Sequence, residues 1–201
     1  MITVVPIVEG HGEVAAVPAL LHRIGAKVSP DVGFLINEPI RVSRDRFIRN
    51  SDDEFIRKLK LAALKCLNQG WILILLDADD DCPKELGVSI LQRAQEVVPQ
   101  SKVSVVLANR EYEAWFLAAA TSLNGVCGFE FHESSLPDAE SIRGAKEWLS
   151  KRITNGRYHE VQDQPVFTRR MDLEMALSRS RSLRKLCSEW QKQMTADPAN
   201  Q

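Results

Sequence analysis

The sequence predicts an α/β fold, a doubly wound and mainly parallel sheet with helices on both of its faces. Three apolar runs are typical of strands buried on both faces: Ile2–Val8, Trp71–Leu76 and Val103–Ala108. Segments with a helical apolar period lie between these runs, and short connections join them. Because strands that alternate with helices form parallel sheets, the carboxyl ends of all three strands are expected along one edge.

Two helices are expected before the central strand. The first follows Val8 and ends at Gly25, and the second begins at a capping box of Ser51 and Glu54 and ends at Gly70. Between them, the segment 33–42 predicts a weaker strand. The residues expected to face the core are Val14, Val17, Leu21 and Ile24 in the first helix and Phe55, Leu59, Ala63 and Leu67 in the second.

Two more helices are expected after the central strand. Pro83 suits the first turn of the third helix, and Asn109 caps a fourth helix over 110–123. The inner face of the third helix is expected to carry Leu86, Ile90 and Val97.

The C-terminal part is expected to be a less regular extension. Polar residues, glycines and scattered aromatics over 125–165 indicate loops or small elements, and Asp172 then opens a last, basic helix. We therefore divide the chain into an α/β domain over 1–124 and an extension over 125–201 that packs on it. The packed side of the last helix is expected to carry Leu173, Leu177, Ser180, Leu183, Leu186 and Trp190.

The composition favours a cytoplasmic protein of one domain with a small appendage. A chain of 201 residues is long enough to bury a core without disulfides or a structural metal. The longest apolar run, Trp71–Leu76, is too short to span a membrane, and we expect neither a signal peptide nor a membrane partner. The four cysteines are widely spaced without a C-x-x-C pair, so free thiols are expected.

Charge is distributed unevenly along the chain. Residues 1–140 hold 14 Lys and Arg against 20 Asp and Glu, whereas residues 141–195 hold 12 against 6. The acidic part suggests a cation site, and the basic part suggests an anionic partner. The alternative is that both are ordinary solvated faces.

Acidic residues follow each of the three strands at corresponding places. They are Glu9 and Glu13 after the first strand, Asp77, Asp79, Asp80 and Asp81 after the central strand, and Glu111 and Glu113 after the last. Since the carboxyl ends of parallel strands share one edge, these groups are expected to converge in the crevice there.

Converging carboxylates repel one another, and a hard divalent cation such as Mg²⁺ (or Mn²⁺) resolves the repulsion. The local alternative is that acids in the first turn of a helix are common, which explains Glu13, Glu111 and Glu113 equally well. It explains neither Glu9 at the end of a buried strand nor four aspartates in five residues. Asp80 and Asp81 are equally suited to capping the next helix.

Other chemistries find less support. The sequence has no P-loop, no third glycine for a dinucleotide-binding turn, and no nucleophile elbow. A phosphatase centred on Asp77 lacks a clear phosphate-binding loop and lysine. His11, between two glycines, suits a phosphate contact or a base, and is equally consistent with simple exposure.

These motifs resemble the Toprim fold. "VEGHGE" places a glutamate after the first strand, and "LLDADDD" places Asp-x-Asp after a central strand. Type IA and type II topoisomerases, DnaG-type primases and the overcoming-lysogenization-defect nucleases share that fold, and the E-G-x-x-E opening is most similar to the last group. "NREYEAWFLAA" and "SRSRSLRKL" resemble small stand-alone Toprim-like proteins that are often encoded beside ATPases in bacterial defence loci.

The resemblance implies roles for individual residues. Glu9 matches the general acid/base or metal ligand, Asp77 and Asp79 match the Asp-x-Asp metal ligands, and Glu13 matches the second acid of the nuclease opening. Glu111 or Glu113 would complete that site. Neither Tyr112 nor Tyr158 is clearly placed as a topoisomerase nucleophile, and a primase zinc module is absent from the sequence.

The expected function is therefore a Mg²⁺- or Mn²⁺-dependent nuclease acting on DNA or RNA, with an ATPase as the implied partner. The basic tail suits a grip on the nucleic acid backbone, although each arginine is as easily explained by packing or solubility. The alternative is a catalytically weak Toprim-like subunit that acts by binding a partner protein. The arginines of the expected nucleic-acid surface are Arg169, Arg170, Arg179, Arg181 and Arg184.

Overall fold

A parallel sheet forms the centre of the molecule in the computed structural model, which describes residues 1–48, 52–67, 70–132, 136–154 and 156–195. The strand order is β2–β1–β4–β5. Strand β3 also pairs with β1, nearer the carboxyl end of β1 than β2 does. The four strand pairings of the described sheet are all parallel, and an isolated antiparallel bridge joins Phe129 and Ile153 outside it. The strands are β1 (Ile2–Val8), β2 (Phe34–Ile36), β3 (Ile40–Arg41), β4 (Trp71–Asp77) and β5 (Lys102–Ala108).

The expected strand over 33–42 is divided into β2 and β3. Asn37 donates its backbone N–H to Val4, and the chain then leaves the ladder before rejoining β1 at Ile40. Pro39, which has no N–H to donate, lies in this interruption.

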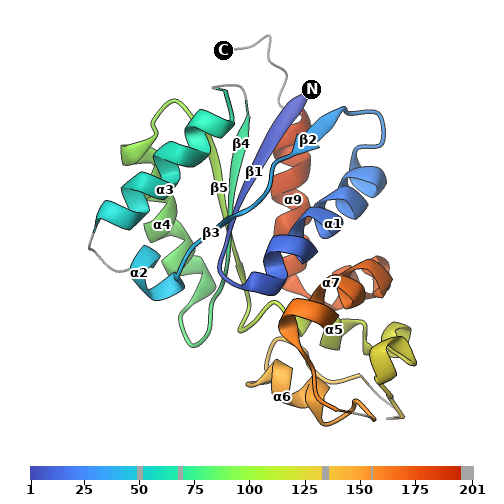
Figure 1. Cartoon of the computed structure of the whole chain (residues 1–201). Helices are drawn as coiled ribbons and strands as arrows, with labels where there is room; N and C mark the ends of the chain where they lie inside the picture. Colours follow the sequence, from blue (N-terminus) through green and yellow to red (C-terminus); the bar gives the residue numbers. More distant parts are fainter. Residues whose placement is uncertain (49–51, 68–69, 133–135, 155, 196–201) are drawn as a thin grey trace.

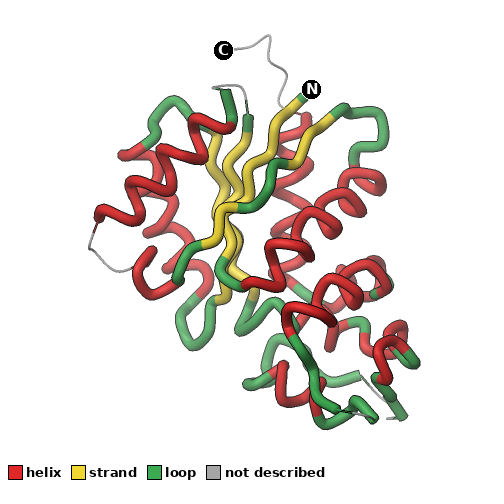
Figure 2. The backbone as a smooth tube through the Cα atoms, in the orientation of Figure 1, coloured by secondary structure: helices red, strands yellow, loops and turns green. Residues whose placement is uncertain are grey.

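Helices cover both faces of the sheet (Figures 1 and 2), which confirms the predicted fold class. On one face lie α1 (His11–Val28) and α9 (Arg181–Thr195); on the other lie α2 (Arg44–Ile48), α3 (Asp52–Lys65) and α4 (Pro83–Val97). Helix α5 (Ala114–Ala118) adds to the first core from beyond the carboxyl edge of the sheet (Figure 1). Successive strand residues alternate between the two cores: Val4 and Val8 face the first, and Val5 and Ile7 face the second.

Helix α1 continues past Gly25 to Val28, so the predicted end was wrong. Gly25 is buried inside the helix, where a Cβ would lie 2.5 Å from the Phe34 ring and 2.8 Å from Trp190. The glycine is therefore explained by close packing rather than by helix termination. Trp190 of α9 also meets Trp71 edge-on, with ring centroids 5.9 Å apart.

Helix α3 shows a different inner face near its end from the one predicted. Phe55 and Leu59 are buried as expected, but Ala62 and Cys66 are buried next, while Leu67 is 80% exposed. The expected N-cap, Ser51, lies outside the described residues.

The helix expected after Asn109 is short, and the last helix is divided. Helix α5 has five residues and passes into a 3-10 turn over Ala120–Leu123, while the Asn109 amide donates to Glu140 instead of capping a helix. Asp172 caps α8 (Leu173–Arg179) by accepting from the Met175 N–H at 2.9 Å. Ser180 then takes an extended conformation, and α9 begins at the next residue.

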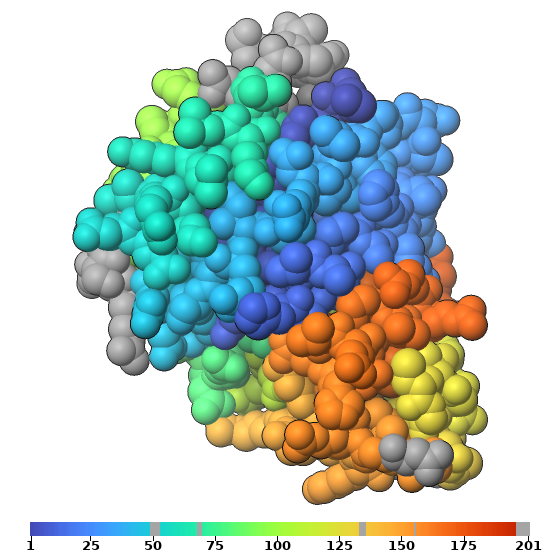
Figure 3. Space-filling view, in the orientation of Figure 1, coloured from blue at the N-terminus to red at the C-terminus, as the bar shows by residue number. Residues whose placement is uncertain are grey.

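The segment expected to be irregular contains two helices, α6 (Ala145–Ser150) and α7 (Glu160–Arg170). Helix α7 lies along α1, and in Figure 3 the orange residues of this segment lie directly below the blue residues of α1. Because α7 packs on α1 and α9 packs on β5, the C-terminal part covers the sheet and its carboxyl edge. The domain boundary at residue 124 stays a prediction.

All four cysteines are free thiols, as the sequence predicts. No helix in the described ranges is long and apolar enough to cross a membrane.

We predict that Gly12→Ala and Gly87→Ala change stability in opposite directions. A Cβ on Gly12 would lie 2.4 Å from Gln164 Oε1 and 2.5 Å from the Glu160 carbonyl, so Gly12→Ala should lower the free energy of unfolding by about 1–3 kcal/mol. Gly87, inside α4, has open space around it, so Gly87→Ala should raise it by about 0.5–1 kcal/mol. Urea unfolding followed by circular dichroism measures both, and equal changes would contradict the packing of α7 on α1.

Candidate functional site

Four carboxylates from three segments meet at the carboxyl edge of the sheet, between β1 and β4. We call them the acid cluster: Glu9, Glu13, Asp77 and Glu113. The chain crosses from β1 to β2 on one side and reaches β4 on the other, so this edge is the topological switch point where ligands bind in such sheets. The predicted convergence of the acidic groups is therefore present for these four residues.

Backbone N–H groups hold two members of the acid cluster. Glu13 Oε2 accepts from the N–H groups of Glu9 at 2.9 Å and Gly10 at 3.3 Å, at the start of α1. Asp77 Oδ1 accepts from the Tyr112 N–H at 2.8 Å. Glu13 thus accepts hydrogen bonds at the start of its helix, as the local alternative expects, and also lies in the acid cluster. Its role as a metal ligand stays a prediction.

The C-terminal part of the chain holds Glu113. Its Oε1 accepts from the Tyr158 hydroxyl at 3.0 Å and from Gln164 Nε2 at 3.1 Å, and all three side chains are buried. The hydroxyl of Tyr112 is bound elsewhere, at 3.0 Å from Thr168 Oγ1. Both tyrosines are therefore engaged in buried hydrogen bonds.

Burial and mutual repulsion disfavour ionisation of the acid cluster. Burial raises the pKa of Glu13 to about 7, and the charge of Glu113 raises it too. Burial likewise raises the pKa of Glu113 to about 7. The pKa of Asp77 is raised well above its usual range by burial and by Glu13, and that of Glu9 is raised by burial and by Asp79. A bound cation would relieve this cost.

Lys146 of α6 is the cation whose charge reaches most of the acid cluster, because it lowers the pKa values of Glu9, Asp77 and Glu113. Its Nζ donates to Glu160 Oε2 at 2.9 Å. Although burial opposes its charge, Glu113 and Glu160 raise the pKa of Lys146 above its ordinary value. One ammonium group shared with Glu160 does not balance four carboxylates.

The acid cluster offers the type of donor atom that a hard cation prefers, but its side chains are not arranged around a common point. Glu9 Oε2 and Glu113 Oε2 are buried without a hydrogen-bond partner among the described residues. Carboxylate oxygens are the ligands that Mg²⁺ prefers. However, no group of three or more His, Cys, Asp or Glu side chains in the described part of the chain is arranged to hold a metal ion. Ion binding therefore requires side-chain rotation within the cluster.

Asp79 lies beside the acid cluster and turns toward Arg44. Its side chain is 56% exposed, and its Oδ2 lies 3.4 Å from Arg44 Nη1. Arg44 also donates to the carbonyl of Asp77 at 2.9 Å. Asp79 and Arg110 both have positive φ, +50° and +68°, and the Asp79 N–H donates to the Arg110 carbonyl. Two non-glycine residues in the left-handed region store strain where β4 and β5 end.

Glu111 and Glu113, which the sequence left as alternatives, take different places. Glu111 Oε1 accepts from the N–H groups of Gly144 at 3.1 Å and Ala145 at 3.2 Å, at the start of α6. Glu113 alone of this pair lies in the acid cluster.

Asp80 and Asp81 form ion pairs instead of capping α4, whose N-cap is Cys82. Asp80 pairs with Arg110 and Arg143, and Asp81 pairs with Arg44. A cavity of about 190 Å³ lies here, lined by Asp79, Asp80, Arg110, Glu111, Arg143 and Gly144. We call it the edge cavity.

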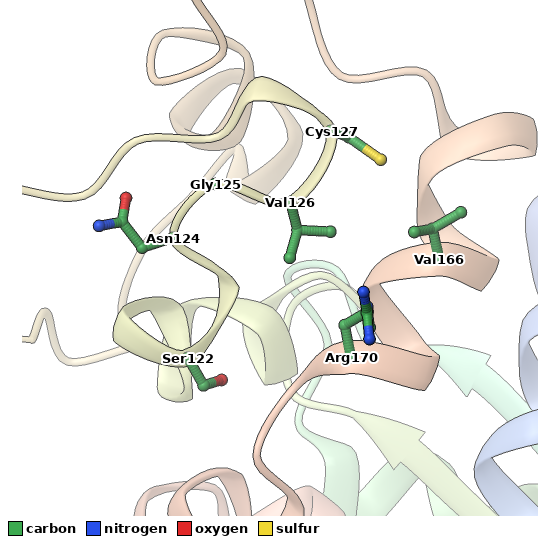
Figure 4. A pocket seen from close by; sticks show the side chains of 7 residues that line it. All are labelled: Ser122, Asn124, Gly125, Val126, Cys127, Val166 and Arg170. Atoms are coloured by element: carbon green, nitrogen blue, oxygen red, sulfur yellow. The ribbon is translucent and has the colours of Figure 1, made fainter.

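The five predicted arginines are separated into two groups. Three of them line a cavity of about 330 Å³ at the end of β5, which we call the arginine cavity: Asn109, Asp138, Glu140, Ser141, Arg179, Arg181 and Arg184. Arg169 and Arg170 are exposed on α7. Arg170 lines a different cavity of about 500 Å³, where it lies near Val126 and Val166 (Figure 4). No member of the acid cluster lines that cavity.

The sequence gives no motif for the residues that support the acid cluster, chiefly Arg44, Lys146, Tyr158 and Gln164. Three of them lie in the segment that was expected to be irregular, and their spacing carries no motif. The excess of basic residues over 141–195 was the one available signal, and it pointed to a substrate surface rather than to this cluster.

The sheet edge and most of the C-terminal helices belong to one family match. The model of DUF4276, described as a domain of unknown function, matches residues 8–190. No curated protein and no solved structure matches the chain.

We predict that, in EDTA, stability falls as pH rises from about 5 to about 8. Glu13 and Glu113 have pKa values of about 7 when folded and about 4.5 when exposed, so the folded chain binds more protons in this window. Glu113→Gln removes one such group and should raise the free energy of unfolding at pH 8 by about 1–3 kcal/mol, with little change at pH 5. Thermal unfolding across pH measures this.

The control is Glu96→Gln, which replaces an exposed carboxylate on α4 and should leave the pH dependence as in the wild type. A Glu113→Gln curve parallel to the wild-type curve would show that Glu113 does not titrate in this window.

Proposed function

The chain belongs to the DUF4276 family, and we propose that it is a Mg²⁺- or Mn²⁺-dependent nuclease that hydrolyses phosphodiester bonds in DNA or RNA. One observation carries the proposal. Four carboxylates are gathered and largely buried at the switch point of a parallel sheet, and two of their oxygens have no partner among the described residues. Burying like charges together costs stability, and a bound cation would offset that cost.

The residues suited to hold an ion are Glu9, Glu13, Asp77 and Glu113, and Asp79 joins them if it leaves Arg44. When bound, a divalent ion polarises a phosphodiester and lowers the pKa of a water molecule. Glu113 and Asp77 are already oriented, because one carboxylate oxygen of each accepts a hydrogen bond from the protein. The other oxygen of each remains available to a ligand.

Glu9 is the residue best suited to accept a proton from an attacking water. Its Oε2 is buried without a partner among the described residues, and its pKa is raised by burial and by Asp79, which brings it closer to neutral pH. Lys146 supplies a positive charge that Glu160 holds in place and that suits the charge developing on the phosphate.

The resemblance to Toprim proteins supports the proposal, because Glu9 and the Asp77-x-Asp79 pair stand after adjacent parallel strands in the expected order. It also motivates an ATPase as the partner protein, since the sequence contains no P-loop of its own.

A second candidate function is that of a catalytically weak subunit that binds a partner protein. Three leucines on or just after α3 favour it: Leu61, Leu64 and Leu67 are 42%, 74% and 80% exposed. The last helix, α9, offers no such surface through Leu183, Leu186 and Trp190, because these residues are buried, as the sequence predicts.

We predict that Mn²⁺ binds the wild type and that Glu9→Gln/Asp77→Asn weakens this binding at least about tenfold. Both substitutions keep hydrogen-bonding capacity while removing two charges, so the fold should persist. Isothermal calorimetry measures the affinity, and cleavage of plasmid and single-stranded substrates measures activity, with and without a candidate ATPase. Activity should fall at least about 100-fold in the double variant and vanish in EDTA.

Asp53→Asn, which removes an exposed charge on α3, is the matched control and should bind Mn²⁺ like the wild type. A wild type that binds no ion at millimolar concentration would contradict the nuclease proposal and favour the partner-binding subunit.

A further inference from the structure

We propose that the arginine cavity binds a phosphate group of a nucleic acid strand whose scissile bond lies at the acid cluster. The inference rests on the proposed function, which supplies the substrate class. The cavity has a volume of about 330 Å³ and is lined by three arginines. It begins at Asn109, the residue after β5, and therefore lies on the same edge of the sheet as the acid cluster.

Two of the guanidinium groups are held in place without losing their charge. Arg179 donates to the carbonyls of Leu136 and Pro137 at 3.2 and 2.9 Å, and Arg184 donates to the carbonyl of Leu177 at 2.6 Å. A neutral carbonyl orients a guanidinium but does not neutralise it, and each guanidinium has five N–H donors. Donors that are ordered in advance reduce the entropy cost of binding an anion.

Arg181, the first residue of α9, is the adaptable member of the three. Its side chain is exposed and makes no hydrogen bond or ion pair with another residue of the described ranges. Its donors therefore remain available for a ligand in the cavity.

The principal carboxylate of the cavity is committed to the protein. Glu140 Oε1 accepts from Ser180 Oγ at 2.7 Å and from the Ser182 N–H at 2.9 Å, and Oε2 receives the Asn109 amide at 3.4 Å. Although burial opposes its ionisation, these hydrogen bonds lower the pKa of Glu140. Glu140 thus fixes the turn between α8 and α9 that presents the arginines. With Asp138 as the other carboxylate, the cavity keeps a net positive charge.

The arginine cavity and the edge cavity are neighbours, because consecutive stretches of chain line both. Asn109 lines the first and Arg110 the second, and Ser141 lines the first while Arg143 lines the second. The edge cavity includes Asp79, whose charge acts on Glu9. The bound nucleic acid strand therefore runs, in this proposal, from the acid cluster past Arg110 and Arg143 to the arginine cavity. Contacts of this kind hold the backbone and carry no base sequence information.

The test measures binding of a single-stranded oligonucleotide by fluorescence anisotropy in EDTA, so that cleavage does not interfere. Arg181→Gln should raise Kd about fivefold at 50 mM salt, and Arg181→Gln/Arg184→Gln should raise it further. The slope of log Kd against log salt should fall by about 0.7 for each phosphate that an arginine no longer neutralises. Arg57→Gln, an exposed arginine on α3 across the sheet, is the matched control and should bind like the wild type.

Oligonucleotides with a 5′-phosphate or a 5′-hydroxyl distinguish the source of the phosphate. A larger loss of affinity for the 5′-phosphate form assigns the cavity to a terminal phosphate, and equal losses assign it to an internal one. Both outcomes support the proposal. Wild-type affinity in both arginine variants, or an equal loss in Arg57→Gln, overturns it while leaving the nuclease proposal intact.

Inorganic phosphate separates this inference from the proposed function. In a ¹H–¹⁵N spectrum, phosphate should shift the backbone resonances of Ser141 and Arg181, and Arg181→Gln should weaken that effect. If phosphate binds there while no oligonucleotide binds the wild type, the anion site stands and the nuclease proposal fails. If neither ligand perturbs the cavity, the proposed phosphate site is wrong.

Discussion

The hydrogen bonds from Tyr158 and Gln164 to Glu113 connect the two halves of this molecule. Glu113 is fully buried at the end of the sheet, and its partners come from α7 and the segment just before it. A buried carboxylate without donors would cost several kcal/mol or take up a proton, so the C-terminal part must be in place for the edge to exist in this form. The close approach of α7 to Gly12 of α1 is a second contact between the C-terminal part of the chain and the sheet edge.

This dependence gives the acid cluster its chemical character. Burial that comes from α7 raises the pKa values of the carboxylates, and the same burial strengthens their attraction to a cation. Lys146 and Glu160 also lie in the C-terminal part of the chain, and Lys146 partly balances the negative charge of the acid cluster. The C-terminal part of the chain therefore raises the free-energy cost of ionising the carboxylates by burying them, and it offsets part of that cost with the charge of Lys146. A bound ion would offset the rest.

The loops after β4 and β5 link the acid cluster to the surface. Asp79 and Arg110 meet in strained conformations, Arg44 holds the Asp77–Asp81 loop from α2, and Asp80 joins Arg110 to Arg143. These contacts are charged and partly exposed, so the anionic substrate that we propose would compete with Asp79 and Asp80 for the same guanidinium groups. The arginine cavity continues this basic path along the end of β5.

The sequence by itself determined the buried strands, their alternation with helices and the gathering of acidic residues, Glu9, Glu13 and Asp77 among them, at one edge of the sheet. Periodicity and parallel topology together dictate which strand ends reach that edge. It also predicted that Asp172 begins a helix, since a cap is local. Only the tertiary structure decided that Glu113 rather than Glu111 enters the cluster, that Asp79 faces Arg44, and that Gly25 serves packing. Those outcomes depend on contacts between residues far apart in the chain, such as Glu113 with Gln164, which no local pattern encodes.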